Sequence, residues 1–138
     1  MRWIDKAKDV ARSYNSNRKE LEILIESQER GIKTANIASM RSGRISRPVE
    51  RVVVEQLSNE RIAYLKHAIF AVDYALCKVG ERPQGEITKK LYEMVYRDRT
   101  HLLFGAAQEL HISDATARRY NQYFLKIIAS QMGFIQIF

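Results

Sequence analysis

The chain has 138 residues, of which 46% are hydrophobic and 28% are charged, and its formal net charge is +7 at pH 7. This length predicts one domain, or a small domain with a helical extension, and the composition excludes a disordered tail. No run approaches the roughly 20 apolar residues that span a bilayer. The first ten residues interleave charged and apolar side chains, so we expect neither a membrane protein nor a secretory signal. The positive charge favours a polyanionic partner where it is concentrated.

The single cysteine, Cys77, cannot form a disulfide within the chain. This favours a reducing cytosol as the compartment. Cys77 lies within an apolar helical pattern, so we expect a small buried hydrophobic residue rather than a catalytic nucleophile.

Residues 3–29 carry apolar side chains at near-heptad spacing, which predicts one long helix. The segment 13–17, SYNSN, has poor helix propensity, and we expect it to kink this helix or to split it in two. Gly31 is a plausible end of the helix. Residues 32–47 combine Ser, Thr, Asn and Gly with arginines and lack an apolar period, which predicts a polar linker loop.

Four arginines lie in or beside this linker: Arg41, Arg44, Arg47 and Arg51. A solvated loop is the simpler interpretation, and an arm that contacts phosphates is the alternative.

Pro48 is well placed as the first residue of a second long helix, because its fixed φ suits that position. The series Ile62, Leu65, Ile69, Val72, Leu76 and Val79 predicts that this helix extends to about Val79. Residues 1–80 are therefore expected to form a long helical hairpin. Its surplus apolar surface is available to a second copy of the chain, so a homodimer is one interpretation and an intramolecular pair alone is the other.

Residues 80–85, GERPQG, form a turn cluster that we interpret as a domain boundary, with residues 81–138 as the second domain. A short amphipathic helix is expected over residues 86–96. Its inner face should carry Ile87, Leu91, Met94 and Val95. Thr100 is a good N-cap for the next helix, which should end near Leu110.

Residues 103–120, LFGAAQELHISDATARRY, have the spacing of a helix-turn-helix DNA reader. The small pair Ala106 and Ala107 allows two helices to cross closely, and the turn is expected at His111. Ser113 should cap the second helix by accepting from the backbone N–H of residue 115 or 116. That helix should run from residue 114 to about 132 and end at Gly133. The alternative is an ordinary helical hairpin with a solvated basic face.

The second helix of this motif divides into two faces. Ala117, Tyr120 and Phe124 recur at helical spacing and should point inward, and the apolar ending FIQIF should be buried. The outward set is expected to be Ala115, Arg118, Arg119 and Gln122.

The outward residue types suit base and phosphate contacts. Arg118 can bridge guanine and Gln122 can bridge adenine with paired hydrogen bonds, while Ala115 can touch a thymine methyl group. Arg119, one step round the helix, more plausibly reaches a phosphate. Thr100 would offer a helix N-terminus to the DNA backbone, with Arg97 and Arg99 beside it.

No catalytic pattern is present in the sequence. The three histidines lack metal-ligand spacing, and there is neither a phosphate-binding glycine loop nor a nucleophile elbow. We therefore expect no enzyme activity, metal, cofactor or small-molecule substrate.

The segments YRDRT (residues 96–100), HIS (111–113), DATARR (114–119) and KII (126–128) resemble phage late-gene transcriptional activators of the RinA and ArpU type. Pro-Val-Glu at residues 48–50, after a polar linker, fits the same layout, whereas the ending MGFIQIF is more apolar than in those activators. The resemblance implies an all-α fold, with a long helical hairpin followed by a C-terminal helix-turn-helix domain similar to region 4 of sigma factors.

This resemblance implies a phage or prophage protein in the bacterial cytoplasm that binds double-stranded DNA, activates late genes and can contact RNA polymerase. It supports Ser113 as the cap and five DNA-facing positions: Ala115, Thr116, Arg118, Arg119 and Gln122. Two other functions fit the sequence. One is a small terminase subunit that recognises DNA for packaging, and the other is a helical adaptor that does not bind DNA.

Overall fold

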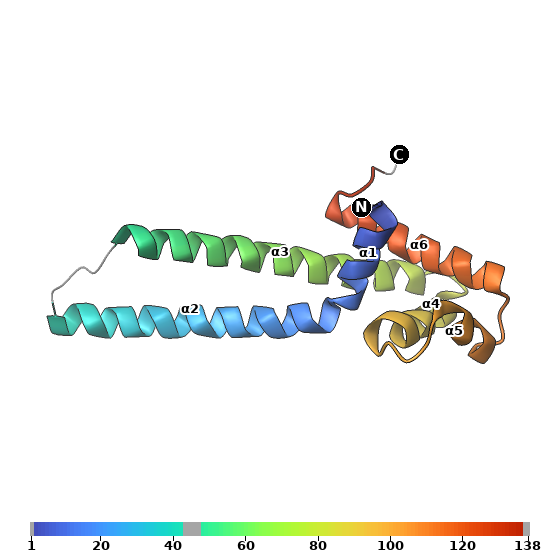
Figure 1. Ribbon diagram of the computed structural model, residues 1–138, viewed down its shortest axis with the longest axis horizontal. Coiled ribbons are helices and arrows are strands. Elements are labelled where there is room, and N and C mark those ends of the chain that lie inside the picture. The colour runs from blue at the N-terminus through green and yellow to red at the C-terminus, as the bar shows by residue number, and fades with distance from the viewer. Residues whose placement is uncertain (1, 43–47, 137–138) are drawn as a thin grey trace. The chain divides into compact units, whose positions relative to one another are not determined.

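The chain is all-α over the residues that the computed structural model describes, which are 2–42 and 48–136, without the side chains of 31–42 and 48–54. The elements are α1 (Trp3–Arg12), α2 (Tyr14–Ser42), α3 (Pro48–Gly80), α4 (Gly85–Tyr92), the π-helical turn η1 (Glu93–Arg97), α5 (Leu103–Glu109) and α6 (Asp114–Met132). Figure 1 shows the long helices α2 and α3 and the shorter helices of the chain.

The chain divides into two compact units. The C-terminal unit comprises Met1–Asn15 and His67–Phe138, and the long-helix unit comprises Ser16–Lys66. This division differs from the expected one, at residues 80 and 81, because α1 packs against α6. Both the start of the chain and the last turns of α3 therefore belong with the C-terminal helices.

The SYNSN segment splits the first helical region, as one of the two expectations stated. Ser13 lies between α1 and α2, and its backbone N–H donates to Asp9 O at 3.0 Å. The predicted end at Gly31 is wrong, because α2 continues to Ser42. One glycine costs a helix only about 1 kcal/mol, which a long helix tolerates. The predicted linker is therefore helical over residues 32–42, and its remainder, 43–47, lies outside the described residues together with the side chains of its arginines.

Helix α3 begins at Pro48, as predicted, and ends at Gly80. Its buried side chains include three alanines between the larger residues of the predicted series: Ala68, Ala71 and Ala75. The prediction for Cys77 is wrong, because its side chain is exposed. Cys77 is two residues from both Ala75 and Val79, which are buried, so it lies on the opposite side of the helix.

The long-helix unit is held partly by polar contacts between α2 and α3. The Arg61 guanidinium donates to both carboxylate oxygens of Glu20, at 2.8 and 3.0 Å, and the Gln28 amide donates to Asn59 Oδ1 at 2.8 Å. The Arg61 partner lowers the pKa of Glu20. Ile23 and Leu57 remain 61% and 60% exposed, so this unit leaves part of its apolar surface in solvent.

The core of the C-terminal unit is aromatic. Phe124 of α6 is 1% exposed, and its ring lies 5.4 Å from that of Tyr92 and 6.4 Å from that of Tyr96, measured between centroids. The Tyr96 hydroxyl donates to Asn121 Oδ1, whereas the Tyr92 hydroxyl is buried without a partner among the described residues. Burial raises the pKa of both tyrosines.

The π-helical turn η1 changes the predicted inner face of the helix at 86–96. Asp98 N donates to Glu93 O at 2.8 Å, five residues back, which shifts the register of the following residues. Of the predicted inner residues only Leu91 is fully buried, while Ile87, Met94 and Val95 are half-buried. The deeply buried side chains beside Leu91 are instead those of Tyr92 and Tyr96.

Helix α6 ends at Gly133, as predicted. Gly133 has φ 77°, the left-handed conformation that glycine adopts without strain. Phe134 and Ile135 then pack, half-buried, against the core of the C-terminal unit. The last two residues of the apolar ending lie outside the described residues.

Candidate nucleic-acid interface

Helices α5 and α6 are joined by a tight turn over residues 110–113. Ala106 and Ala107 are fully buried where α5 packs on α6. His111 has φ 59°, and Ile112 N donates to Ala107 O at 3.0 Å, which closes the turn. The turn therefore lies where the sequence predicted it, with a histidine in the left-handed conformation, in which Asn, Asp and His are the enriched residues other than glycine.

Ser113 caps α6, as predicted. Its hydroxyl oxygen accepts from Thr116 N at 3.2 Å, and the hydroxyl donates to Thr116 Oγ1 at 2.8 Å. Asp114 follows in the first turn, where a carboxylate interacts favourably with the helix dipole. The start of α6 is thus fixed by local chemistry.

One exposed face runs along α6 from its first turn. Ala115, Arg119 and Gln122 are exposed, at intervals of four and three residues, so they point in one direction. Lys126, four residues further on, is exposed on the same face. We missed Lys126 in the sequence, although its spacing from Gln122 was visible there. We call Ala115, Arg119, Gln122 and Lys126 the outer face.

Arg118 lies beside this face and contacts α5. Its guanidinium carbon is 5.2 Å from the centre of the Phe104 ring, and Phe104 is 46% exposed. The ring restricts the arginine through a cation–π contact and leaves its N–H groups free to donate. The predicted inward residues Ala117 and Phe124 are buried, and Tyr120 is half-buried.

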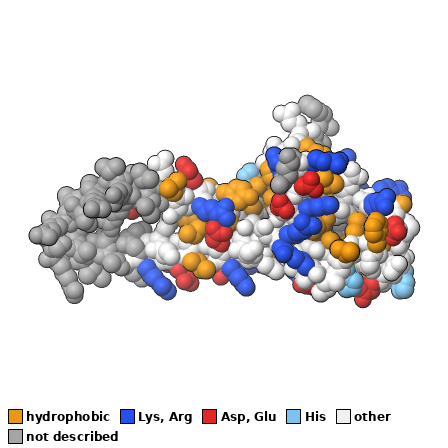
Figure 2. Space-filling view, viewed as in Figure 1, with side chains coloured by type: hydrophobic (Ala, Val, Ile, Leu, Met, Phe, Trp, Pro, Cys, Tyr) orange, Lys and Arg blue, Asp and Glu red, His pale blue; other side chains and the backbone are white. Residues whose placement is uncertain are grey.

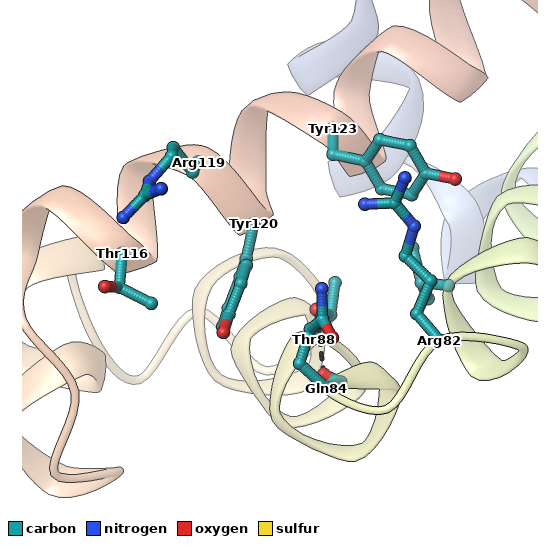
Figure 3. A pocket seen from close by; sticks show the side chains of 8 residues that line it. Arg82, Gln84, Thr88, Thr116, Arg119, Tyr120 and Tyr123 are labelled. Atoms are coloured by element: carbon teal, nitrogen blue, oxygen red, sulfur yellow. Dashed lines mark hydrogen bonds between the residues drawn. The ribbon is translucent and has the colours of Figure 1, made fainter.

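A cleft of about 330 Å³ borders the outer face on its other side. Its polar lining comes from α6, from the turn after α3 and from α4 (Figure 3), and consists of Arg82, Gln84, Thr88, Thr116, Arg119, Tyr120 and Tyr123. Val79 completes the lining. Arg119 and Thr116, both on α6, therefore also line this cleft.

Arg82 is a cleft residue that was not predicted from the sequence. Its guanidinium carbon lies 3.7 Å from the centre of the Tyr123 ring, and Figure 3 shows the two groups stacked face to face. Tyr123 packs against the core and under Arg82. The pairing joins positions 41 residues apart, so no local pattern could reveal it.

The turn that carries Arg82 is held by a close backbone approach. A Cβ at Gly85 would lie 2.3 Å from Val79 O and 2.8 Å from Gly80 Cα, closer than real Cβ contacts. Only glycine fits there without backbone movement. Gly85 therefore fixes the direction in which the Glu81–Gln84 turn leaves α3.

The residues before α5 are placed differently from the prediction. Thr100 does not cap a helix, because α5 begins at Leu103 and Leu102 is its N-cap residue. The Thr100 hydroxyl instead contacts Met94 O and His101 Nδ1, at 3.4 and 2.8 Å. The π-helical turn ends at Arg97, and residues 98–102 between it and α5 are not helical.

Arg97 and Arg99, the two predicted neighbours of this end, both have partners within the protein. Arg97 pairs with Asp98 at 3.2 Å and with Glu93 at 3.5 Å. Arg99, at φ 54°, donates to Arg12 O at 3.2 Å. Arg99 also lines a second cleft, of about 340 Å³, together with Lys8 and Arg12 of α1. This cleft does not include Arg97 or Thr100.

Two of the three histidines have side-chain partners within the protein. His67 Nε2 lies 2.6 Å from Gln131 O, and His101 Nε2 lies 2.5 Å from Glu109 Oε2. In the part of the chain that the structure describes, no three His, Cys, Asp or Glu side chains are grouped to hold a metal ion. No described helix is both long enough and apolar enough to cross a membrane.

Basic side chains do not gather in one patch on the face of the protein that Figure 2 shows, where Lys and Arg alternate with Asp and Glu. Net charge alone therefore does not locate a partner surface. Comparison of the chain with protein-family models, with curated proteins and with solved structures finds no match.

Proposed function

We propose that this protein is a sequence-specific DNA-binding regulator of transcription, and that α5, the turn at residues 110–113 and α6 act as a helix-turn-helix. The observation that carries the proposal is the outer face of α6, which begins at a capped helix end and presents Ala115, Arg119, Gln122 and Lys126 to solvent. A helix with short or hydrogen-bonding side chains near its N-terminus fits the major groove of B-DNA.

The roles follow from residue chemistry and position. Arg118, oriented by Phe104, donates two hydrogen bonds to a guanine edge, Gln122 donates to N7 and accepts from the N6 amino group of an adenine, and Ala115 contacts a thymine methyl group. Arg119 contacts a phosphate. Ser113 and Thr116 keep the helix end in place, so their contribution is to positioning.

The resemblance to phage late-gene activators extends the proposal to a biological setting. In that setting the protein acts in the cytoplasm of a bacterial host, binds near late promoters and contacts RNA polymerase. Run-off transcription from a promoter that carries the bound sequence tests this extension: added protein should raise transcript yield. Reduced yield would indicate a repressor instead.

DNA binding itself is tested by selecting duplexes from a random pool and measuring affinity by fluorescence anisotropy. The selected duplex should bind far more tightly than the starting pool at moderate salt. Arg118→Ala should weaken binding to the selected duplex by about 1–3 kcal/mol and relax the preference at one position. The control is Arg30→Ala, which removes the same charge from an exposed residue of α2 and should leave that preference unchanged.

Other outcomes would replace the proposal. Binding without sequence preference, together with a large ring assembly by light scattering, would indicate a DNA-packaging recognition subunit. No binding even at low salt would leave a helical adaptor. A concentration-dependent mass of twice the chain would establish the homodimer, and two half-sites in the selected duplex should then accompany it.

A further inference from the structure

We infer that the cleft between the Glu81–Gln84 turn and α6 is a contact site for the phosphates of the DNA backbone, with Arg82 at one end and Arg119 at the other (Figure 3). This inference rests on the proposed function and adds to it a residue outside the helix-turn-helix. It assigns Arg82, which lies before α4, to the DNA contact.

The lining chemistry suits a phosphate diester. Arg82 and Arg119 bring two guanidinium groups to one cavity, and the hydroxyls of Thr116 and Tyr120 and the amide of Gln84 add neutral donors. No Asp or Glu side chain lines the cleft. Guanidinium groups bind phosphate oxygens through parallel N–H donors, so the cleft offers an anion several donors and no competing carboxylate.

Both arginines are available to a ligand. Their side chains are exposed, and no ion pair to either is present among the described residues. Arg99 and Arg97, by contrast, already donate to groups of the protein itself. The stack on Tyr123 holds Arg82 by its planar face and leaves the N–H edge free, which reduces the conformational entropy lost on binding.

The position of the cleft favours a nucleic-acid backbone over a free anion. Arg119 belongs both to the outer face and to the cleft. A duplex whose bases face Ala115 and Gln122 therefore brings the flanking sugar–phosphate strand alongside the cleft. Gly85 fixes the turn that carries Arg82, so the second guanidinium is positioned before DNA arrives.

The salt dependence of DNA binding tests this site. Each phosphate contact contributes about 0.9 to the slope of log K against log salt concentration. Arg82→Ala should therefore lower that slope by about one and weaken binding equally for the selected duplex and for random DNA. Arg82→Gln, which removes the charge but keeps most of the stem, should do the same and guards against a disturbed turn.

Lys90→Ala is the matched control. Lys90 is exposed on α4, two residues beyond the cleft residue Thr88, and does not line the cleft. The substitution Lys90→Ala removes the same charge from the same unit and should change the slope of log K against log salt concentration much less than Arg82→Ala does. Equal slopes for wild type and both Arg82 variants would overturn the inference, and so would an equal loss in Lys90→Ala.

A methylphosphonate scan of the selected duplex locates the phosphate. Neutralising one particular phosphate should weaken binding of the wild type and cause no further loss in Arg82→Ala. Additive losses at every position would overturn the inference while leaving DNA binding intact. Absence of DNA binding by the wild type would instead reject the proposed function, and the inference with it.

Titration with inorganic phosphate distinguishes the alternative source of the same chemistry. Side-chain NMR signals of Arg82 and Arg119 should respond to the duplex at much lower concentration than to phosphate. Tight binding of free phosphate, with no effect of Arg82→Ala on DNA affinity, would make the cleft a free-anion site and overturn the inference.

Discussion

The C-terminal unit and the long-helix unit are stabilised in different ways. In the C-terminal unit single residues determine the geometry: Phe124 fills the aromatic core, Gly85 allows a close backbone approach, and Ser113 caps α6. In the long-helix unit the described contacts between α2 and α3 include exposed polar pairs, and Leu57 stays in solvent. Single substitutions at these positions of the first unit should therefore have large effects, whereas substitutions of the exposed residues of the second should have small ones.

Truncating a fully buried aromatic side chain should give the largest effect. Phe124→Ala removes a ring that is 1% exposed and should lower the free energy of unfolding by about 3–5 kcal/mol. Leu57→Ala in the long-helix unit, at 60% exposure, should change it by about 0.5 kcal/mol or less. Urea unfolding measures both changes. The fluorescence of Trp3, which packs against the C-terminal core, reports on Phe124→Ala, and circular dichroism reports on Leu57→Ala. Similar losses for both variants would contradict the comparison.

A methyl group at Gly85 should be the next most damaging change. Gly85→Ala places a Cβ against Val79 O, so the turn must move, at a cost of about 1–3 kcal/mol. Gly80→Ala is the matched control, because its Cβ would meet only the flexible end of Lys89, at 3.2 Å. Thermal unfolding of both variants measures this difference, and Gly85→Ala should have the lower midpoint temperature. A tolerated Gly85→Ala would show that the turn is not fixed by this approach.

Removing the cap of α6 should have a smaller effect. Ser113→Ala leaves Thr116 N without its acceptor and should cost about 1 kcal/mol. Thr100→Ala should cost less, since its exposed hydroxyl makes a long contact to Met94 O, at 3.4 Å, and caps no helix. The two free energies of unfolding, measured side by side, test the difference. A greater loss of stability in Thr100→Ala than in Ser113→Ala would contradict this ranking.

The exposed ion pair in the long-helix unit should also have only a small effect on stability. Arg61→Ala should cost at most about 1 kcal/mol at pH 7, because solvent screens Arg61 and Glu20. Since the folded pKa of Glu20 is lowered from 4.5, the stabilisation is fully present above that value and disappears as pH falls through the lowered pKa. Urea unfolding at pH 7 and at acid pH, with Glu20→Gln as the partner variant, measures it. A destabilisation by Arg61→Ala that grows toward acid pH would contradict this pH dependence.

Local chemistry explains which parts of the fold could be predicted from sequence. Pro48, Ser113 and Gly133 act within one or two turns of a helix end, and the ends they mark are where they were predicted. The end at Gly31 was wrong because the cost of one glycine is small beside the cooperativity of a long helix. The exposure of Cys77 could not be read from apolar spacing, because the neighbouring alanines shift the buried side of α3.

The candidate site also contains parts that could be predicted from the sequence and parts that could not. The exposed positions of α6 follow from helical periodicity once its start is known, and Lys126 could have been found by continuing it. The start of α5 could not be predicted, because no local sequence pattern indicates the π-helical turn η1 that precedes it. The stack of Arg82 on Tyr123 joins two distant segments and needs the tertiary fold.

The most direct test of the proposed function is a map of backbone amide shifts when the selected duplex is added to the full chain, measured by NMR. The shifts should concentrate at residues 113–126 of the turn and α6 and at residues 81–84 beside the cleft, with little change over residues 16–30 of α2. Shifts confined to the long-helix unit, or none at all under conditions where a duplex should be bound, would contradict a DNA-reading role for α6.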